Sequence, residues 1–222
     1  VTLSADLDGD ILNGQATIRM SASEPEDKDI PAVEQEREER IPSAYQVIPE
    51  VMWAPASGGG TWLTEVFITD LTGGTEVSAT FNGISGDRRG PFTVFTGAAP
   101  DSCIKIDNLL DKLDQIDSGF SYYGTIGAVE FSTQDKNHKI HVIARTKNGH
   151  YSKTFQGLNF NDNNLAGGSR VMMIQNLSAN TSFRSAYGAF NPTEEAVSIE
   201  YRIMDKNGNT IGNVFKCGGF LR

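Results

Sequence analysis

Apolar and polar residues alternate along most of this chain, which is the pattern of β-strands that bury one face. In residues 61–71, for example, Val66 and Ile68 fall on one face while Glu65 and Phe67 fall on the other. Similar segments are found at 76–83, 91–97, 125–133, 139–147, 150–156, 169–177, 184–190, 196–205 and 209–215. The pattern predicts an all-β chain made of Ig-like β-sandwich modules in tandem.

Turn residues between these segments predict which strands pair. Residues 61–71 and 76–83 flank a Thr-Gly-Gly turn and are predicted to form a hairpin. A polar loop joins 125–133 to 139–147 in the same way, and the Asp-Lys-Asn-Gly sequence at 205–208 is a strong hairpin-turn signal.

Two segments depart from simple alternation. Prolines interrupt 47–55, and proline cannot donate a ladder hydrogen bond, so this strand is predicted to lie at a sheet edge. Residues 107–117 instead have a helical period, with Asp107 as the expected N-cap. The apolar stripe of this single short helix is Leu109, Leu110, Leu113 and Ile116.

The N-terminal region has two parts of opposite character. Residues 1–23 alternate on either side of an Asp-Gly-Asp turn and predict a hairpin, which is not stable alone in water. It must pair with the rest of the chain, with another copy, or with a preceding domain. Residues 24–43 are rich in acidic residues and poor in apolar ones, which favours a solvated linker. The alternative is an acidic tether that binds a partner.

An internal repeat sets the domain prediction. Residues 61–81 align with 181–201 when one residue is deleted in the turn, so that Asp70 meets Asn191, and 47–53 align with 171–177. An offset of this size suits a sandwich module and is too long for a solenoid. In the first alignment Val77, Ala79 and Phe81 meet Val197, Ile199 and Tyr201. We therefore predict a first module at 44–157 and a second, partial module at 158–222. The competing interpretation is a coincidence of two ordinary hairpins.

A family resemblance follows the same residues. The stretches VIPEV, GGGTWLTEVFITDLTGG, ARTKNG and RSAYGAFNPTEEAVSIEYRIMDKNGNTIG resemble uncharacterised tandem β-sandwich repeats in secreted proteins of environmental bacteria. The resemblance implies export and a non-enzymatic accessory role, and it carries over no catalytic residue. The stretch DLDGDILNGQATIRMSAS is similar to the closing hairpin of calcium-associated Ig-like surface modules.

Charge and composition narrow the classes of partner. The formal net charge is −9, which disfavours nucleic acid as a partner. The apolar runs are far shorter than the roughly 20 residues of a membrane-spanning helix, so no membrane insertion is expected. No export signal opens the sequence, so we expect it to be already removed or not included. Cys103 and Cys217 are predicted to form a disulfide if the compartment is oxidising, and are otherwise unrelated thiols.

One group of oxygen ligands is a candidate metal site. Asp6, Asp8, Asp10 and Asn13 offer the hard ligands that Ca²⁺ prefers, although their spacing departs from that of an EF-hand loop. The alternative is an acidic hairpin turn, and no other cofactor is expected. His138 and His141 are predicted to lie on opposite faces of a strand, so that they cannot share a metal.

Aromatic residues suggest a glycan site. Tyr122 and Tyr123 follow a glycine-containing turn and are the candidates for an exposed surface on which a sugar stacks. The alternative is that they anchor the loop or the core. Trp62 aligns with Phe183 in the repeat, which favours a core position.

No catalytic motif is present: the sequence lacks GxSxG, HExxH, P-loop and GxGxxG patterns. We therefore predict a non-enzymatic structural or assembly module, extracellular or at the cell surface. Its expected partners are other copies or surface proteins, and the N-terminal hairpin is predicted to add to a neighbouring sheet. The alternative function is a carbohydrate-binding accessory domain.

Overall fold

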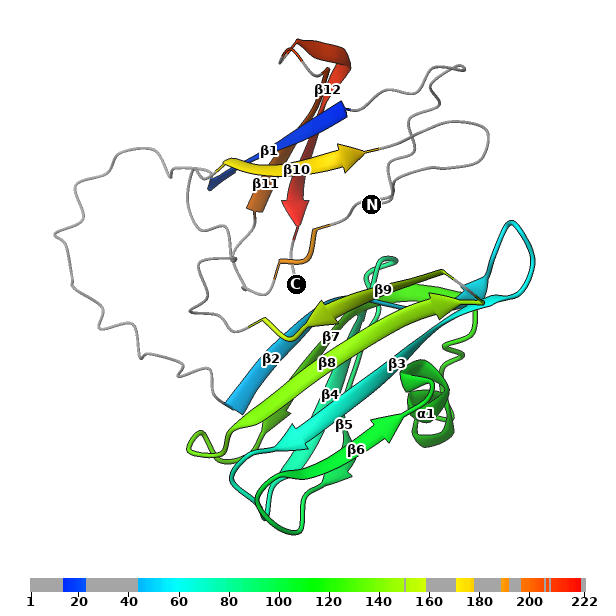
Figure 1. The fold of residues 1–222 in the computed structure, drawn as a ribbon, viewed down its shortest axis with the longest axis vertical. Coiled ribbons are helices and arrows are strands. Elements are labelled where there is room, and N and C mark those ends of the chain that lie inside the picture. The colour runs from blue at the N-terminus through cyan, green and yellow to red at the C-terminus, as the bar shows by residue number, and fades with distance from the viewer. Residues whose placement is uncertain are drawn as a thin grey trace, which may run out of the picture. The chain divides into compact units, whose positions relative to one another are not determined.

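The computed structural model describes residues 14–22, 44–149, 151–158, 171–177, 189–191, 197–205, 207 and 209–220. The chain forms two compact units, which are treated separately below (Figure 1). Gln35–Leu165 is the central unit, and Val1–Glu34 together with Ala166–Arg222 is the terminal unit.

The central unit contains one antiparallel sheet of eight strands and a short helix. The sheet order is β5-β4-β7-β2-β3-β8-β9, and β6 pairs with β3 outside this path. The elements are β2 (Tyr45–Pro55), β3 (Thr61–Asp70), β4 (Glu76–Gly83), β5 (Arg88–Thr96), β6 (Ser102–Ile106), α1 (Leu109–Ile116), β7 (Thr125–Thr133), β8 (Ile140–Asn148) and β9 (Tyr151–Gln156).

The terminal unit contains a four-stranded antiparallel sheet in the order β10-β1-β11-β12. Its strands are β1 (Gly14–Ala22), β10 (Val171–Leu177), β11 (Val197–Met204) and β12 (Thr210–Phe220). The hairpin predicted at 205–208 is confirmed, because β11 pairs with β12 and the backbone N–H of Asp205 donates to Asn209 O at 2.8 Å.

The prediction of a mainly β chain with one short helix is confirmed for the described residues. The three leucines of the predicted helical stripe are buried, whereas Ile116 is 41% exposed. The N-cap is Asn108, whose side chain accepts a hydrogen bond from Asp111 N. Asp107 was therefore wrong as the N-cap, and it forms an ion pair with Lys105 at 2.6 Å instead.

The predicted edge position of β2 is wrong, because β2 pairs with β7 on one side and with β3 on the other. The register with β7 shifts between Ile48 and Val51. Pro49 lies within this irregularity, where a strand can tolerate a residue that has no N–H to donate. Pro55 is the last residue of the strand.

Two predicted hairpins are also wrong. β3 pairs with β2, β6 and β8, while β4 pairs with β5 and β7. Likewise β7 pairs with β2 and β4, and β8 pairs with β3 and β9. The loops 71–75 and 134–139 therefore connect strands that do not pair with each other. Alternation predicts the strands themselves but does not decide which of them pair.

One cluster of buried apolar side chains forms the core of the central unit. It draws on both ends of the sheet order, with Phe81 and Phe131 from β4 and β7, and Ile68 and Val142 from β3 and β8. None of these four side chains is exposed. Burying each contributes about 1.5–3 kcal/mol, so this cluster holds the two ends of the strand order together.

The unit boundaries relate directly to the predicted domains. The predicted first module, 44–157, lies within the central unit, and the segments 1–23 and 166–222 share the terminal unit. The predicted linker, 24–43, lies outside the described residues. In the described part of the chain, no helix is long and apolar enough to span a membrane.

Candidate functional site

The position of β1 is the first feature that bears on function. β1 lies inside the terminal sheet, where it pairs with β10 on one side and with β11 on the other. Ile18 lies opposite Met172 and Tyr201 in these two ladders. The sequence predicted that this segment pairs with the rest of the chain, with another copy or with a preceding domain. In the structure it pairs with the rest of the same chain. Residues 1–13 lie outside the described residues.

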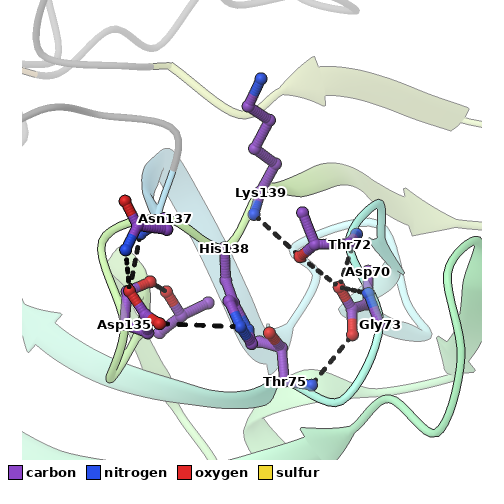
Figure 2. Close-up of polar contacts among 9 residues, drawn as sticks. Asp70, Thr72, Gly73, Thr75, Asp135, Asn137, His138 and Lys139 are labelled. Atoms are coloured by element: carbon purple, nitrogen blue, oxygen red, sulfur yellow. Dashed lines mark hydrogen bonds and ion pairs between the residues drawn. The ribbon is translucent and has the colours of Figure 1, made fainter.

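The buried carboxylate of Asp70 holds the loop that follows β3 in the central unit. Asp70, at the end of β3, accepts hydrogen bonds from the backbone N–H groups of Thr72 at 3.0 Å, Gly73 at 2.8 Å and Thr75 at 3.1 Å (Figure 2). Burial raises the pKa of the Asp70 carboxyl, but these donors outweigh it and hold the pKa below its usual value. A Cβ at Gly97 would collide with this carboxylate.

Figure 2 shows that the Asp70 loop meets a second loop, between β7 and β8. Leu71 N donates to Lys139 O at 2.8 Å, and Lys139 N donates to the Thr72 hydroxyl at 3.2 Å. Asp135 holds the second loop by accepting from the backbone N–H of Asn137 at 2.8 Å. These two loops, 71–75 and 134–139, connect the strands that were predicted to form hairpins. The hydrogen bonds of Lys139 to Leu71 and Thr72 join one loop to the other.

A second buried carboxylate lies on the sheet itself. Glu65 is fully buried on β3 and forms ion pairs with Arg145 and Lys147 of β8, and with Lys105 of β6 at 3.7 Å. Burial raises the pKa of the Glu65 carboxyl, but hydrogen bonds and charge from Lys147 and Arg145 lower it further than burial raises it. Because an unpaired buried charge is costly, the three cations account for the position of Glu65.

The prediction that Tyr122 and Tyr123 are both exposed is wrong for Tyr122. Tyr122 is fully buried, and its ring packs edge-on against Phe81 with centroids 5.4 Å apart. Burial, followed by the charge of Asp117, raises the pKa of the Tyr122 hydroxyl. Tyr123 is 51% exposed and lies edge-on to Trp53 at 5.3 Å. Only Tyr123 remains available for stacking on a ligand.

The remaining predicted sites are not brought together in the part of the chain that is described. Asp6, Asp8, Asp10 and Asn13 lie outside the described residues, so calcium binding stays a prediction. Among described residues, no group of three or more His, Cys, Asp or Glu is placed to hold a metal ion.

Two histidines and one cysteine side chain are among the described residues. His138 lies before β8 and is 3.8 Å from Asp135, while His141 lies on β8 near Gln156. Cys103 is an exposed free cysteine, and the side chain of Cys217 is outside the described residues. The disulfide therefore stays a prediction.

Alternation alone does not mark Asp70 or Glu65 as buried carboxylates, although the sequence around each carries a signal. Asp70 precedes a Thr-Gly-Gly turn, where aspartate side chains accept from following backbone N–H groups. Glu65 lies between the apolar residues Leu63 and Phe67 on one face of its strand. Comparisons with protein-family models, curated proteins and solved structures found no match for this chain. The function must therefore be argued from the geometry.

Proposed function

We propose that this chain is a non-catalytic structural module, extracellular or at the cell surface, that assembles with other copies by strand addition. The N-terminal strand β1 of one copy would fill the place between β10 and β11 of another copy. One observation carries the proposal: β1 is an interior strand of a sheet whose other three strands come from the opposite end of the sequence.

The pairing pattern supports an exchangeable strand. Backbone hydrogen bonds of an added strand are the same whether it comes from its own chain or from a neighbour, so the two arrangements have similar contact energies. The choice between them is then set by the connecting segment and by protein concentration. Residues 24–40 of that segment contain eight acidic and three basic residues, a composition that favours a solvated connection.

The rest of the described chain supports a structural role. The three buried carboxylates of the described residues all have partners within the chain. Asp70 accepts hydrogen bonds from its own loop, Glu65 is neutralised by neighbouring cations, and Glu130 accepts hydrogen bonds from Tyr45 and Asn82. The core of the central unit draws residues from both ends of its strand order, which favours a β-sandwich module. We propose that the terminal unit is a second module of the same kind.

A cross-linking experiment in the full chain tests strand addition. In a background with Cys103→Ser and Cys217→Ser, one sample carries Thr17→Cys and another carries Arg202→Cys. Thr17 and Arg202 lie directly opposite each other in the β1–β11 ladder. The two samples are unfolded, mixed and refolded under oxidising conditions. Strand addition between copies predicts a disulfide-linked dimer that increases with protein concentration.

The matched control uses the central unit, where both strands come from one continuous region. Ser78 and Ser132 lie directly opposite each other in the β4–β7 ladder. Samples carrying Ser78→Cys and Ser132→Cys separately should give little linked dimer. If the Thr17/Arg202 pair gives no more dimer than this control at any concentration, copies do not exchange β1 and the proposal is wrong.

A second candidate function is glycan binding, favoured by the exposed ring of Tyr123 beside Trp53. An aromatic ring with one free face and a fixed edge can stack on the apolar face of a sugar without losing much side-chain entropy. Tyr122 has no part in this version, because it is buried in the core.

A further inference from the structure

The two sheets share an order of four strands. The terminal sheet runs β10-β1-β11-β12, and one end of the central sheet runs β2-β7-β4-β5. All neighbouring pairs in both sets are antiparallel. The sequence alignment already places β2 against β10 and β4 against β11. The strand order adds one correspondence that the alignment does not contain: β1 takes the same position in its sheet as β7 does in the other.

The ladders on one side of β1 and β7 agree in register. In the central unit, Phe81 lies opposite Val129 and Ala79 lies opposite Phe131. The alignment replaces Phe81 by Tyr201 and Ala79 by Ile199. In the terminal unit these two residues lie opposite Ile18 and Met20. Ile18 therefore corresponds to Val129, and Met20 corresponds to Phe131.

The ladders on the other side give the same correspondence independently. Val129 lies opposite Ile48, and Ile18 lies opposite Met172, which the second alignment places at the position of Ile48. Four residues further towards the start of each interior strand, Thr125 lies opposite Trp53 and Gly14 lies opposite Leu177. In both units the outer strand advances five residues over this span. Each pair therefore carries a one-residue bulge within this span, although the bulge lies opposite Gly127–Val129 in the central unit and opposite Gly14–Ala16 in the terminal unit.

A second irregularity recurs in the pairing of β4 with β5 and of β11 with β12. Between Val77 and Ala79 the paired residue on β5 moves from Phe95 to Phe92. Between the aligned residues Val197 and Ile199, the paired residue on β12 moves from Phe220 to Cys217. In both cases the outer strand, β5 or β12, advances three residues while its partner advances two. The next shifts in these ladders fall at different positions, between Ala79 and Phe81 in the central unit and between Tyr201 and Ile203 in the terminal unit. The shared shift is therefore one further agreement beside the register with β1 and β7.

We infer that β1 occupies in the terminal unit the place that β7 occupies in the central unit, so that the position between β10 and β11 accepts a strand of the β7 type. This inference rests on the strand addition proposed above and names its partner: the N-terminal strand of a second copy, in the register of β7. The terminal sheet then repeats four strands of the central one, except that its counterpart of β7 is supplied by a segment that precedes the central unit in the sequence.

Grafts in the full chain test the inference. In the first variant, residues 14–22 are replaced by the β7 sequence 125–133, TIGAVEFST, so that Val129 and Phe131 fall at positions 18 and 20. In the control, the same positions receive residues 126–134, IGAVEFSTQ, which shifts the pattern by one residue and places glutamate at position 18. A one-residue shift exchanges the two faces of a strand.

The readout is amide hydrogen exchange of β11 measured on the intact protein. The in-register graft should keep exchange of Val197–Met204 within about tenfold of wild type, whereas the shifted graft should accelerate it by about a hundredfold or more. Equal protection in both grafts, or loss in both, would overturn the correspondence of β1 with β7.

Point substitutions guard against a graft that fails for other reasons. Ile18→Val with Met20→Phe introduces the corresponding β7 residues, and Thr17→Val with Arg19→Phe introduces the same residues one position away. The first pair should retain β11 protection and the second should lose it, and the reverse result would overturn the inference. Since these variants report pairing within the sheet, they remain decisive even if cross-linking finds no exchange between copies.

Discussion

The two units differ in where their interior strands come from. In the central unit β7 lies between β2 and β4, and all three strands belong to one continuous region of the chain. In the terminal unit β1 lies between β10 and β11 but comes from the other end of the sequence. The same place in a sheet is thus filled by a local strand in one unit and by a distant strand in the other.

This difference has an energetic consequence. Closing a long connection costs entropy that grows only slowly with its length, so a distant strand can still pair stably. An identical strand from a neighbouring molecule competes with it through concentration, because the ladder contacts are the same. The central unit has no such competition for β7, since that strand is connected within the unit at both ends.

The largest predicted effect on stability comes from disrupting β1, the interior strand of the terminal sheet. Ile18→Pro removes a backbone donor from a strand that is paired on both sides and places a ring against the ladder, so it should cost more than the about 1–3 kcal/mol of one buried acceptor left unpaired. We expect fast amide exchange in β11 and an unchanged unfolding transition of the central unit. Both tryptophans, Trp53 and Trp62, belong to the central unit, so their fluorescence reports that transition alone.

The matched control is Val129→Pro at the corresponding position of β7. Val129 is fully buried and pairs with β2 and β4, so this change should abolish the cooperative fluorescence transition. If Ile18→Pro also abolishes that transition, the central unit depends on β1, and the contrast between a self-contained and a completed unit is wrong.

An intermediate effect is predicted for Asp70, which aligns with Asn191 in the terminal unit. Asp70→Asn turns one acceptor oxygen into a donor facing backbone N–H groups, and should destabilise the central unit by about 1–3 kcal/mol at pH 7. The pKa of Asp70 is lowered on folding, so its ionised form stabilises the fold. That contribution is complete above the usual value of 3.8 and is lost as the pH falls through the lowered pKa.

Denaturant unfolding followed by fluorescence at several pH values checks this prediction. The difference between wild type and Asp70→Asn should shrink as the pH falls below 3.8. Asp135→Asn serves as the control, because Asp135 is 53% exposed and holds only the neighbouring loop. If the difference in unfolding free energy between wild type and Asp70→Asn does not change with pH, the charge of Asp70 does not stabilise the loop and the prediction is wrong.

The smallest effect on stability is predicted for Tyr123→Ala. The ring is half exposed, so its loss should cost no more than about 1 kcal/mol through its edge contact with Trp53. On a glycan array, the second candidate function predicts that wild type binds and that this variant does not. Tyr151→Ala, which removes another exposed tyrosine, should leave binding unchanged. An array without signal for wild type would count against glycan binding.

Particular residues show how far the sequence could be interpreted. The leucines of α1 and the alternation in β3, β4, β7 and β8 were predictable, because period follows directly from side-chain geometry. The interior position of β2 was not, because the bulge around Pro49 that admits proline arises only in the pairing of β2 with β7. The sequence left open whether Tyr122 is exposed or anchors the core, because its burial depends on the distant Phe81, which packs on its ring.

By itself the sequence determined the mainly β character, the short helix, the 205–208 hairpin and the alignment between two distant regions. These depend on local period, turn chemistry and similarity, all of which are written along the chain. Only the tertiary structure decided which strands are neighbours, because alternation gives each strand a face but names no partner. That is why β1 was an isolated prediction in the sequence and an interior strand of the terminal sheet in the fold.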